Sequence, residues 1–332
     1  METRREFLKG SGALVAGVTV LGRPGPGRAQ PKMVLKATDV HPLGYPTVEA
    51  IVRMGKKLEA ATSGRLSVQM FPAMQLGGEK EMLEQTQVGA IQICRVSVGP
   101  VGTIVDELNV FNLPFIFRDQ AHMRKVIDGP IGQELIEKIT SAPTSRLVGL
   151  GWMDAGTRSV YAKKAFRKPE DLKGQKIRMM GNPIFVETMN AMGGNGISMG
   201  FNELYSALQT GVVDGAENNP PTLVTHNHYQ VSKVYSLTGH LIIPEIFVFS
   251  RRSWDTLAKE DQALIKKLSQ DAQLEQRDLW DKMVAESVQK LKAAGVEFVE
   301  VDKKAFYNAT KPVRDKYGAK WTALIKRVEE TR

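Results

Sequence analysis

The apolar positions after residue 32 follow a repeating strand and helix pattern. Short, mostly apolar runs at 33–38, 66–71 and 91–96 are typical of strands. The segments between them, 46–62 and 79–88, have the spacing and length of helices. Because helices that join neighbouring strands make those strands run in the same direction, this order predicts a parallel α/β sheet.

Polar residues follow these predicted strands where α/β proteins bind their ligands, at the carboxyl ends of the strands. Asp39 follows the first strand, and Glu79 begins the helix after the second. Arg95 and Ser97 lie at the end of the third strand. These four residues are candidate ligand contacts, although an acid at a helix start, such as Glu79, is also common on solvated surfaces.

The second half of the chain predicts further strands and one long helix. Strands are expected at 147–152, 176–179 and 246–250. Residues 260–294 keep a helical period, which exceeds the usual three to four turns and could brace two lobes. Residues 151–158, after the first of these strands, are expected to form a hinge.

An arginine and an amide are presented by rigid elements in the middle of the chain. Arg178 lies in a predicted strand, and an amphipathic helix ends at Gly211, which accepts a left-handed backbone. A short buried strand at 212–213 should then lead to Asn218. A guanidinium and an amide held together suit a carboxylate ligand. The alternative is a structural salt bridge between Arg178 and an acid of the chain itself, Asp214 or Glu217.

Four stretches, taken together, resemble a known family. They are 71–77 (FPAMQLG), 156–158 (GTR), 169–178 (PEDLKGQKIR) and 203–218 (ELYSALQTGVVDGAEN). Their order and spacing are similar to those of DctP-type solute receptors, the extracytoplasmic binding proteins of TRAP transporters. The resemblance runs over about 34–264.

The resemblance assigns roles to individual residues. It implies that Arg178 binds the carboxylate of the solute, that Arg158 is a second arginine of the site, and that Asn218 is the family asparagine. An additional Asn219 stands before the proline, so either amide could face the ligand. Glu79 resembles a position that accepts from ligand hydroxyls. The other implied pocket positions are Asp39, Arg95, Ser97, Trp152 and Glu245. Trp152 could stack on a sugar face or lie in the core.

The resemblance and the length of 332 residues both imply two domains. The expected fold is α/β and periplasmic-binding-protein-like, with mixed or parallel sheets flanked by helices and a long helix that spans both lobes. Domain I is expected to comprise 31–155 plus 244–283, and domain II 156–243 plus 284–332.

The start of the chain is typical of an export signal. Arg4 and Arg5 form a twin-arginine pattern, residues 10–21 are mildly apolar, and Gly27-Arg28-Ala29 fits a cleavage site. Residues 1–29 are therefore predicted to be removed on export. The apolar core is too short to span a bilayer. The formal net charge is +9, and no nucleic-acid recognition motif accompanies it.

Three features of the sequence have to be weighed as signs of an enzyme or a metal site. Gly196 to Gly200 fits G-x-S-x-G, which would make Ser198 a nucleophile if a helix followed at once. His226 and His228 have no third ligand at a known spacing. Cys94 lies in an apolar run and is expected to be a core residue. An exported serine hydrolase or metal enzyme is therefore the alternative class.

These patterns together predict a periplasmic receptor without a cofactor or metal. The expected ligand is an organic acid, in particular a hydroxylated monocarboxylate such as a hexuronate or aldonate. A smaller oxo- or dicarboxylic acid is the alternative ligand. The resemblance implies the membrane permease subunits of a TRAP transporter as partners.

Overall fold

The computed structural model describes residues 32–332. The predicted signal peptide, residues 1–29, lies outside the described residues. No helix between residues 32 and 332 has both the length and the apolar character that crossing a membrane requires.

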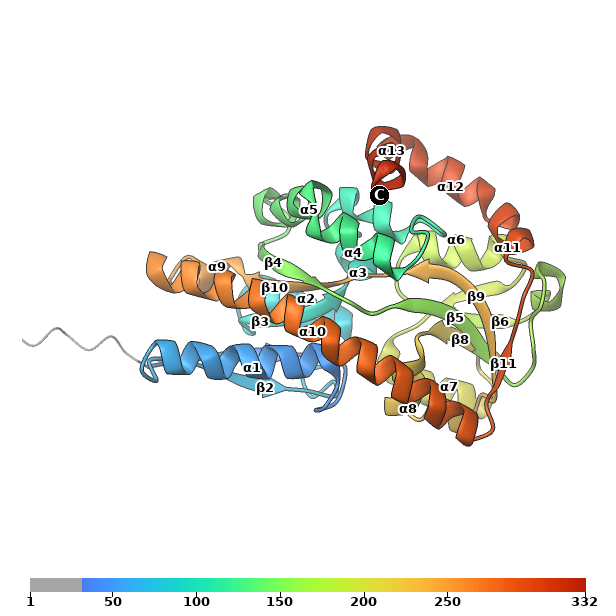
Figure 1. Cartoon of the computed structure of the whole chain (residues 1–332), viewed down its shortest axis with the longest axis horizontal. Helices are drawn as coiled ribbons and strands as arrows, with labels where there is room; N and C mark the ends of the chain where they lie inside the picture. The colour runs from blue at the N-terminus through green and yellow to red at the C-terminus, as the bar shows by residue number, and fades with distance from the viewer. Residues whose placement is uncertain (1–31) are drawn as a thin grey trace, which may run out of the picture. The chain divides into compact units, whose positions relative to one another are not determined.

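The first sheet contains the strands predicted early in the chain and two later ones. Its order is β2-β1-β3-β10-β4 (Figure 1). Strand β1 pairs in parallel with β2 and β3, which confirms the predicted parallel arrangement. Strand β10 runs antiparallel between β3 and β4, so a segment from late in the chain is inserted between two strands from its first half. The bounds are β1 Met33–Thr38, β2 Leu66–Phe71, β3 Ile93–Ser97, β4 Leu147–Met153 and β10 Glu245–Ser250.

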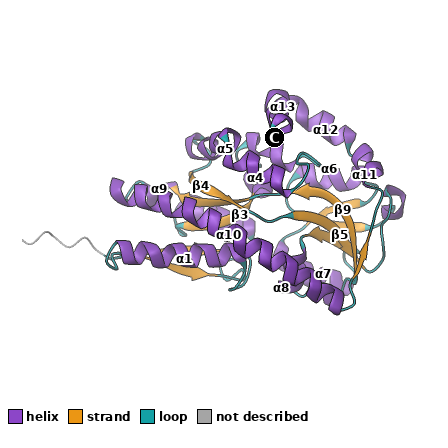
Figure 2. Ribbon diagram, in the orientation of Figure 1, coloured by secondary structure: helices purple, strands orange, loops and turns teal. Residues whose placement is uncertain are grey.

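The second sheet has six strands in the order β11-β9-β5-β8-β6-β7. Strand β6 is parallel to β7 and β8, whereas β5 is antiparallel to β8 and β9. Helices flank both sheets (Figure 2), so the predicted mixed α/β fold is confirmed. The bounds are β5 Thr157–Ala162, β6 Lys176–Met179, β7 Asn195–Ser198, β8 Gly215–Asn218, β9 Val234–Ile242 and β11 Glu297–Val299.

The helices begin and end at local signals in the sequence. The Asn182 side chain accepts a hydrogen bond from the Ile184 N–H at the start of α6, where Pro183 occupies the first turn. The larger helices are α1 Pro46–Ala61, α2 Glu79–Val88, α4 Gln120–Asp128, α5 Pro130–Ser141, α6 Pro183–Ala191, α7 Leu204–Thr210, α10 Lys259–Ala293, α11 Lys303–Ala309, α12 Lys311–Gly318 and α13 Thr322–Glu330. Short turns include α3 Val98–Val101, α8 Pro220–Thr225 and α9 Arg251–Trp254.

The strand expected at 212–213 is wrong. Gly211 ends α7 with a φ of +78°, as predicted, but the chain then needs several residues to turn toward the sheet. Val212 is 55% exposed, and the strand starts at Gly215, two residues after the predicted strand was expected to end. Asn218 nevertheless ends this strand and begins the loop before α8.

The two sheets are joined by chain crossings and by α10. Residues 154–156 link β4 to β5, residues 243–244 link β9 to β10, and the 35-residue α10 contacts α1, β4 and α8. At 1.5 Å per residue, the 35 residues of α10 extend over about 50 Å. Figure 1 shows the helix running from the first sheet to the second. The assignment of the chain to domains at these crossings remains a prediction.

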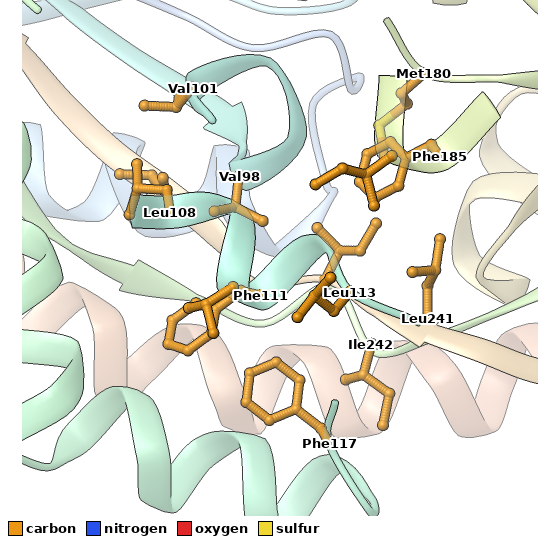
Figure 3. Packing of buried hydrophobic residues seen from close by; sticks show 14 of the residues in the cluster. Val98, Val101, Leu108, Phe111, Leu113, Phe117, Met180, Phe185, Leu241 and Ile242 are labelled. Atoms are coloured by element: carbon orange, nitrogen blue, oxygen red, sulfur yellow. The ribbon is translucent and has the colours of Figure 1, made fainter. Parts of the chain in front are cut away.

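The sheets also share a buried apolar cluster. Val98, Phe111 and Leu113 come from the segment that follows β3, and Phe185 from α6 packs in the same cluster (Figure 3). Gly99 lets the Phe185 ring approach, because a Cβ there would lie 2.5 Å from the ring. Through this contact, α6 of the second sheet packs against the segment that follows β3.

Replacing Gly156 with alanine is expected to destabilise the protein more than replacing Gly174. Both glycines have positive φ values, +62° and +75°, which disfavour a Cβ by about 1–2 kcal/mol. At Gly156 a Cβ would also lie 2.9 Å from the buried ring of Trp280, and overpacking costs about 1–3 kcal/mol. At Gly174 nothing lies within 4 Å. Urea unfolding of both variants measures the difference, and equal losses would contradict it.

Candidate functional site

Three adjacent strands of the second sheet bring the predicted arginines and amide together. Arg178 lies in β6 and pairs with Ala216 of β8, two residues before Asn218. Asn218 in turn pairs with Ser159 of β5, the residue after Arg158. Because β6 and β8 are parallel, their carboxyl ends meet at one edge, where ligands of α/β proteins bind. Arg178, Arg158 and Asn218 therefore form one wall of a site, which we call the basic wall.

The facing wall comes from the first sheet. Ser97 ends β3 and pairs with Glu245, the first residue of β10. Glu79, at the start of α2, accepts hydrogen bonds from the backbone and hydroxyl of Ser97 at 3.1 and 3.0 Å. A cavity of about 30 Å³ separates the two walls. Its lining consists of Val40, His41, Glu79, Arg95, Ser97, Arg158, Arg178, Met180, Phe201, Asn218, Asn219 and Glu245.

Arg178 is buried without a counterion. The side chain is 3% exposed, its Nε donates to the carbonyl oxygen of Met199 at 2.9 Å, and its Nη1 is buried with no hydrogen-bond partner. Burial lowers the pKa of Arg178 below its ordinary value. The alternative salt bridges do not form, because Asp214 accepts from the backbone of Lys176 and Glu217 pairs with Arg158. Among residues 32–332, no carboxylate neutralises this guanidinium.

Arg158, in contrast, is neutralised within the protein. Its Nε and Nη2 donate to the two carboxylate oxygens of Glu217 at 2.6 and 2.8 Å. Its Nη2 also donates to the Glu217 carbonyl, and its Nη1 donates to Asn218 Oδ1 at 2.9 Å. Burial opposes the charge, but the Glu217 carboxylate holds the pKa of Arg158 above its ordinary value. Of the five N–H groups, one on Nη1 is left for a ligand.

The orientation of the two amides distinguishes Asn218 from Asn219. Asn218 Oδ1 accepts from Arg158 and from the Asn219 backbone, which leaves the two donors of its Nδ2 without a protein acceptor. Asn219 Oδ1 caps α8 by accepting from Thr222 N, and its Nδ2 donates to Ala155 O. The side-chain hydrogen bonds of Asn219 therefore stabilise the loop before α8, whereas the amide donors of Asn218 are the ones that a ligand can use.

The facing wall consists of three carboxylates around one arginine, and we call it the acidic wall. Arg95 Nη1 donates to Glu79 at 2.9 Å and to Glu245 at 2.6 Å, while its Nη2 pairs with Asp39. Burial opposes the charge of Arg95, but the carboxylates, Asp39 foremost, hold its pKa well above the ordinary value. Burial raises the pKa of Glu245, against the lowering effect of Arg95. Asp39 is fully buried and positions Arg95 from behind the cavity.

Four residues of the lining were not predicted from the sequence, namely Val40, His41, Met180 and Phe201, and two of them, His41 and Phe201, bring rings to the cavity. His41 stacks on Tyr45, with ring centroids 3.7 Å apart, and its Nδ1 is buried without a partner. Burial lowers the pKa of His41 well below its ordinary value, so the imidazole is neutral. The ring of Phe201 lies 5.7 Å from the guanidinium carbon of Arg178. Both follow strand ends, β1 and β7, so a wider use of the strand-end rule would have included them.

Trp152 does not lie at the site. It is 2% exposed, its indole Nε1 donates to the Gly132 carbonyl at 3.1 Å, and its ring packs edge-on against Phe111. A fully buried tryptophan whose indole N–H has an acceptor in the protein is a core residue. The expectation that it contacts the ligand is not supported by this position.

The residues that suggested other chemistry have ordinary surroundings. Ser198 is exposed at the end of β7, and no hydrogen bond joins it to a histidine among the described residues. His228 Nδ1 is bonded to Tyr161 at 2.7 Å, and His226 Nε2 lies 3.4 Å from Val40 O. Within residues 32–332, no group of three His, Cys, Asp or Glu side chains could hold a metal ion. Cys94 is fully buried.

Comparison with protein families identifies the chain as a receptor. Residues 37–320 match the model of family 7 of the bacterial extracellular solute-binding proteins, DctP. The chain belongs to this family. As a DctP receptor, it is a solute-binding protein and not an enzyme.

Solved structures of TRAP periplasmic solute-binding proteins are similar to this chain over most of its length. A TRAP periplasmic solute-binding protein from Pseudomonas putida F1, with bound D-glucuronate, is 57% identical, with a TM-score of 0.89 over 90% of this chain and 98% of that one. One from Citrobacter koseri, with bound D-glucuronate, is 50% identical, with a TM-score of 0.89 over 90% and 100%. One from Xanthobacter autotrophicus Py2, with bound β-D-galacturonate, is 39% identical, with a TM-score of 0.87 over 90% and 100%.

The two sheets are arranged as in a ligand-bound receptor. The apo, open structure of the same Citrobacter koseri protein has a TM-score of 0.79 over 89% of this chain and 98% of that one, against 0.89 for the bound structure. The identities are nearly the same, 48% and 50%, so the gap reflects conformation and not sequence.

Proposed function

We propose that this DctP receptor captures a hexuronate, such as D-glucuronate or D-galacturonate, by its carboxylate. The observation that carries the proposal is the buried guanidinium of Arg178, which borders the cavity and has no carboxylate partner among the described residues. A buried charge is costly unless it is paired. The ligand carboxylate supplies the missing charge and accepts two parallel hydrogen bonds from the guanidinium fork.

The other donors of the basic wall suit the same carboxylate. Asn218 Nδ2 has two hydrogens without a protein acceptor, and Arg158 retains one N–H on Nη1. Arg158 is held in place by Glu217, so its remaining N–H can orient the ligand carboxylate while the pair contributes no net charge. We infer that the carboxylate lies against Arg178, with Asn218 and Arg158 as secondary contacts.

The opposite end of the ligand needs hydroxyl groups. Glu79 Oε1 is used by Arg95 and Ser97, whereas Glu79 Oε2 makes no hydrogen bond to any of residues 32–332. A carboxylate oxygen accepts hydrogen bonds, and the Nδ1 of neutral His41 is a further polar group at the cavity. A sugar acid has hydroxyls that can bond to both Glu79 Oε2 and His41 Nδ1. The hexuronates bound by the similar receptors support this class, and an aldonate offers the same combination of groups.

Uptake requires the two walls to separate. A cavity of about 30 Å³ holds about one water molecule, so a sugar acid enters when the sheets open about the crossings at 154–156 and 243–244. We propose that the closed, loaded receptor delivers its ligand to the membrane subunits of a TRAP transporter from the periplasm. Export through the twin-arginine route belongs to the same proposal and rests on residues 1–29.

Calorimetric titration with D-glucuronate is expected to give saturable one-to-one binding without chemical change of the sugar. D-glucose is the matched control, because it has the same ring and hydroxyls but no carboxylate to pair with Arg178. It is expected to produce no binding heat. Absence of both binding heat and a thermal shift with D-glucuronate and with D-galacturonate would contradict the proposed ligand class.

A further inference from the structure

We infer that the acidic wall excludes a second carboxylate, so that the receptor accepts monocarboxylates and rejects dicarboxylates of the same carbon length. The inference rests on the proposed function, because it concerns the end of the ligand that lies away from Arg178. Glu79 is the residue that decides it. The sequence had left hydroxylated monocarboxylates and dicarboxylic acids open as alternatives.

The two walls of the site carry opposite charge. On the basic wall, two guanidiniums face one internal carboxylate, which leaves a positive surplus for one ligand anion; the residues are Arg158, Arg178 and Glu217. On the acidic wall, one guanidinium faces three carboxylates; the residues are Arg95, Asp39, Glu79 and Glu245. A ligand that joins the walls therefore needs an anionic end and an end without negative charge.

Arg95 is the one group of the acidic wall that could attract a second carboxylate, and its surroundings prevent this. Both hydrogens of Nη1 are directed at Glu79 and Glu245, and Nη2 pairs with Asp39. Its Nε is buried and has no acceptor among residues 32–332. Because the Arg95 side chain is only 1% exposed, this N–H is shielded from a ligand as well as from water. A ligand carboxylate there would be the fourth anion around one cation in a site shielded from water, where like charges repel strongly.

Glu79 is the part of this wall that meets the ligand. It is more exposed than Arg95, Asp39 or Glu245, with a side-chain exposure of 13%, and it borders both the small cavity and the wider groove outside it. Its Oε2 is an acceptor without a partner in the described part of the chain. A hydroxyl can donate to this oxygen, whereas a second carboxylate has no hydrogen to donate and carries the same charge. Charge and hydrogen bonding at Glu79 therefore both favour a ligand with a hydroxyl at this end over one with a second carboxylate.

The test compares D-gluconate with D-glucarate by calorimetry. Both are open-chain six-carbon acids, and they differ only at the distal carbon, which is an alcohol in gluconate and a carboxylate in glucarate. In wild-type protein, glucarate is expected to bind at least about tenfold more weakly than gluconate. In Glu79→Gln, which removes the charge and keeps an oxygen acceptor, the dissociation constant for glucarate is expected to fall at least about tenfold.

Glu84→Gln is the matched control. Glu84 is exposed on the same helix, α2, and makes no hydrogen bond to the site, so this variant removes one negative charge without changing the acidic wall. It is expected to leave glucarate binding unchanged. The inference is overturned if wild-type protein binds glucarate as tightly as gluconate, or if Glu79→Gln does not bind glucarate more tightly than wild-type protein. Failure of wild-type protein to bind D-glucuronate would instead overturn the proposed function.

Discussion

Arg178→Ala is expected to weaken D-glucuronate binding by at least about a hundredfold. Removing one partner of a buried charged pair costs roughly 3–5 kcal/mol, and each 1.4 kcal/mol is a factor of ten in affinity. Arg158 cannot substitute for the lost charge, because Glu217 already engages its Nε and Nη2. Asn218 has donors but no charge. The measurement is a calorimetric titration of wild-type protein and the variant under the same conditions.

Two controls separate loss of the ligand contact from damage to the fold. Lys176→Ala removes the same charge from an exposed residue of the same strand, β6, and is expected to bind normally. Arg178→Met fills the volume with an apolar chain, and the free energy of unfolding of the ligand-free protein is expected to stay constant or rise, because the buried guanidinium has no counterion there. Unchanged affinity in Arg178→Ala would remove the central assignment.

Arg95→Met is expected to lower the free energy of unfolding by roughly 3–5 kcal/mol, the cost of leaving buried charges unpaired. Three carboxylates, those of Asp39, Glu79 and Glu245, would then face one another without a cation. Lys267→Met is the contrasting variant, because Lys267 and its partner Asp271 are exposed, and such pairs contribute about 0–1 kcal/mol. Urea unfolding at neutral pH measures both variants.

The loss caused by Arg95→Met should depend on pH. Burial raises the pKa of Glu245 in the folded protein, and Arg95 opposes this, so removing Arg95 raises the pKa further. A raised folded-state pKa means that the native protein binds the proton more tightly than the unfolded chain does, so stability falls as pH rises through the folded pKa. The deficit of the variant should therefore be smaller at pH 5 than at pH 7. A deficit that grows toward acid pH would contradict this account of the acidic wall.

The three arginines of the site look alike in sequence but have different roles. Each lies in a strand and each is nearly fully buried. Arg95 holds three carboxylates together, Arg158 is matched by one, and Arg178 has none among the described residues. The unmatched arginine is the one that can take a ligand anion. This difference depends on which acids lie nearby in space. Apart from Glu79, the acids that pair with Arg95 are 56 and 150 positions away in the sequence, and the acid that pairs with Arg158 is 59 positions away.

The sequence by itself determined the local elements and much of the site. Helical spacing with Gly211 at its end predicted α7, the strand expected at 176–179 is β6, and the strand-end rule selected Asp39 and Glu79. These features depend on residues a few positions apart. The family resemblance then assigned Arg178 and Asn218 to one ligand site, and the strand register brings the two residues together.

Only the tertiary structure decided how the charges pair and which side chains reach the cavity. The insertion of β10 between β3 and β4 brings Glu245 beside Ser97, and nothing near either residue in the sequence predicts that contact. The same packing buries Trp152 in the core and leaves Arg178 without a counterion among the residues that the structure describes. The physical reason is that ion pairing and burial depend on the register of strands distant in sequence, whereas helix and strand formation depend on near neighbours.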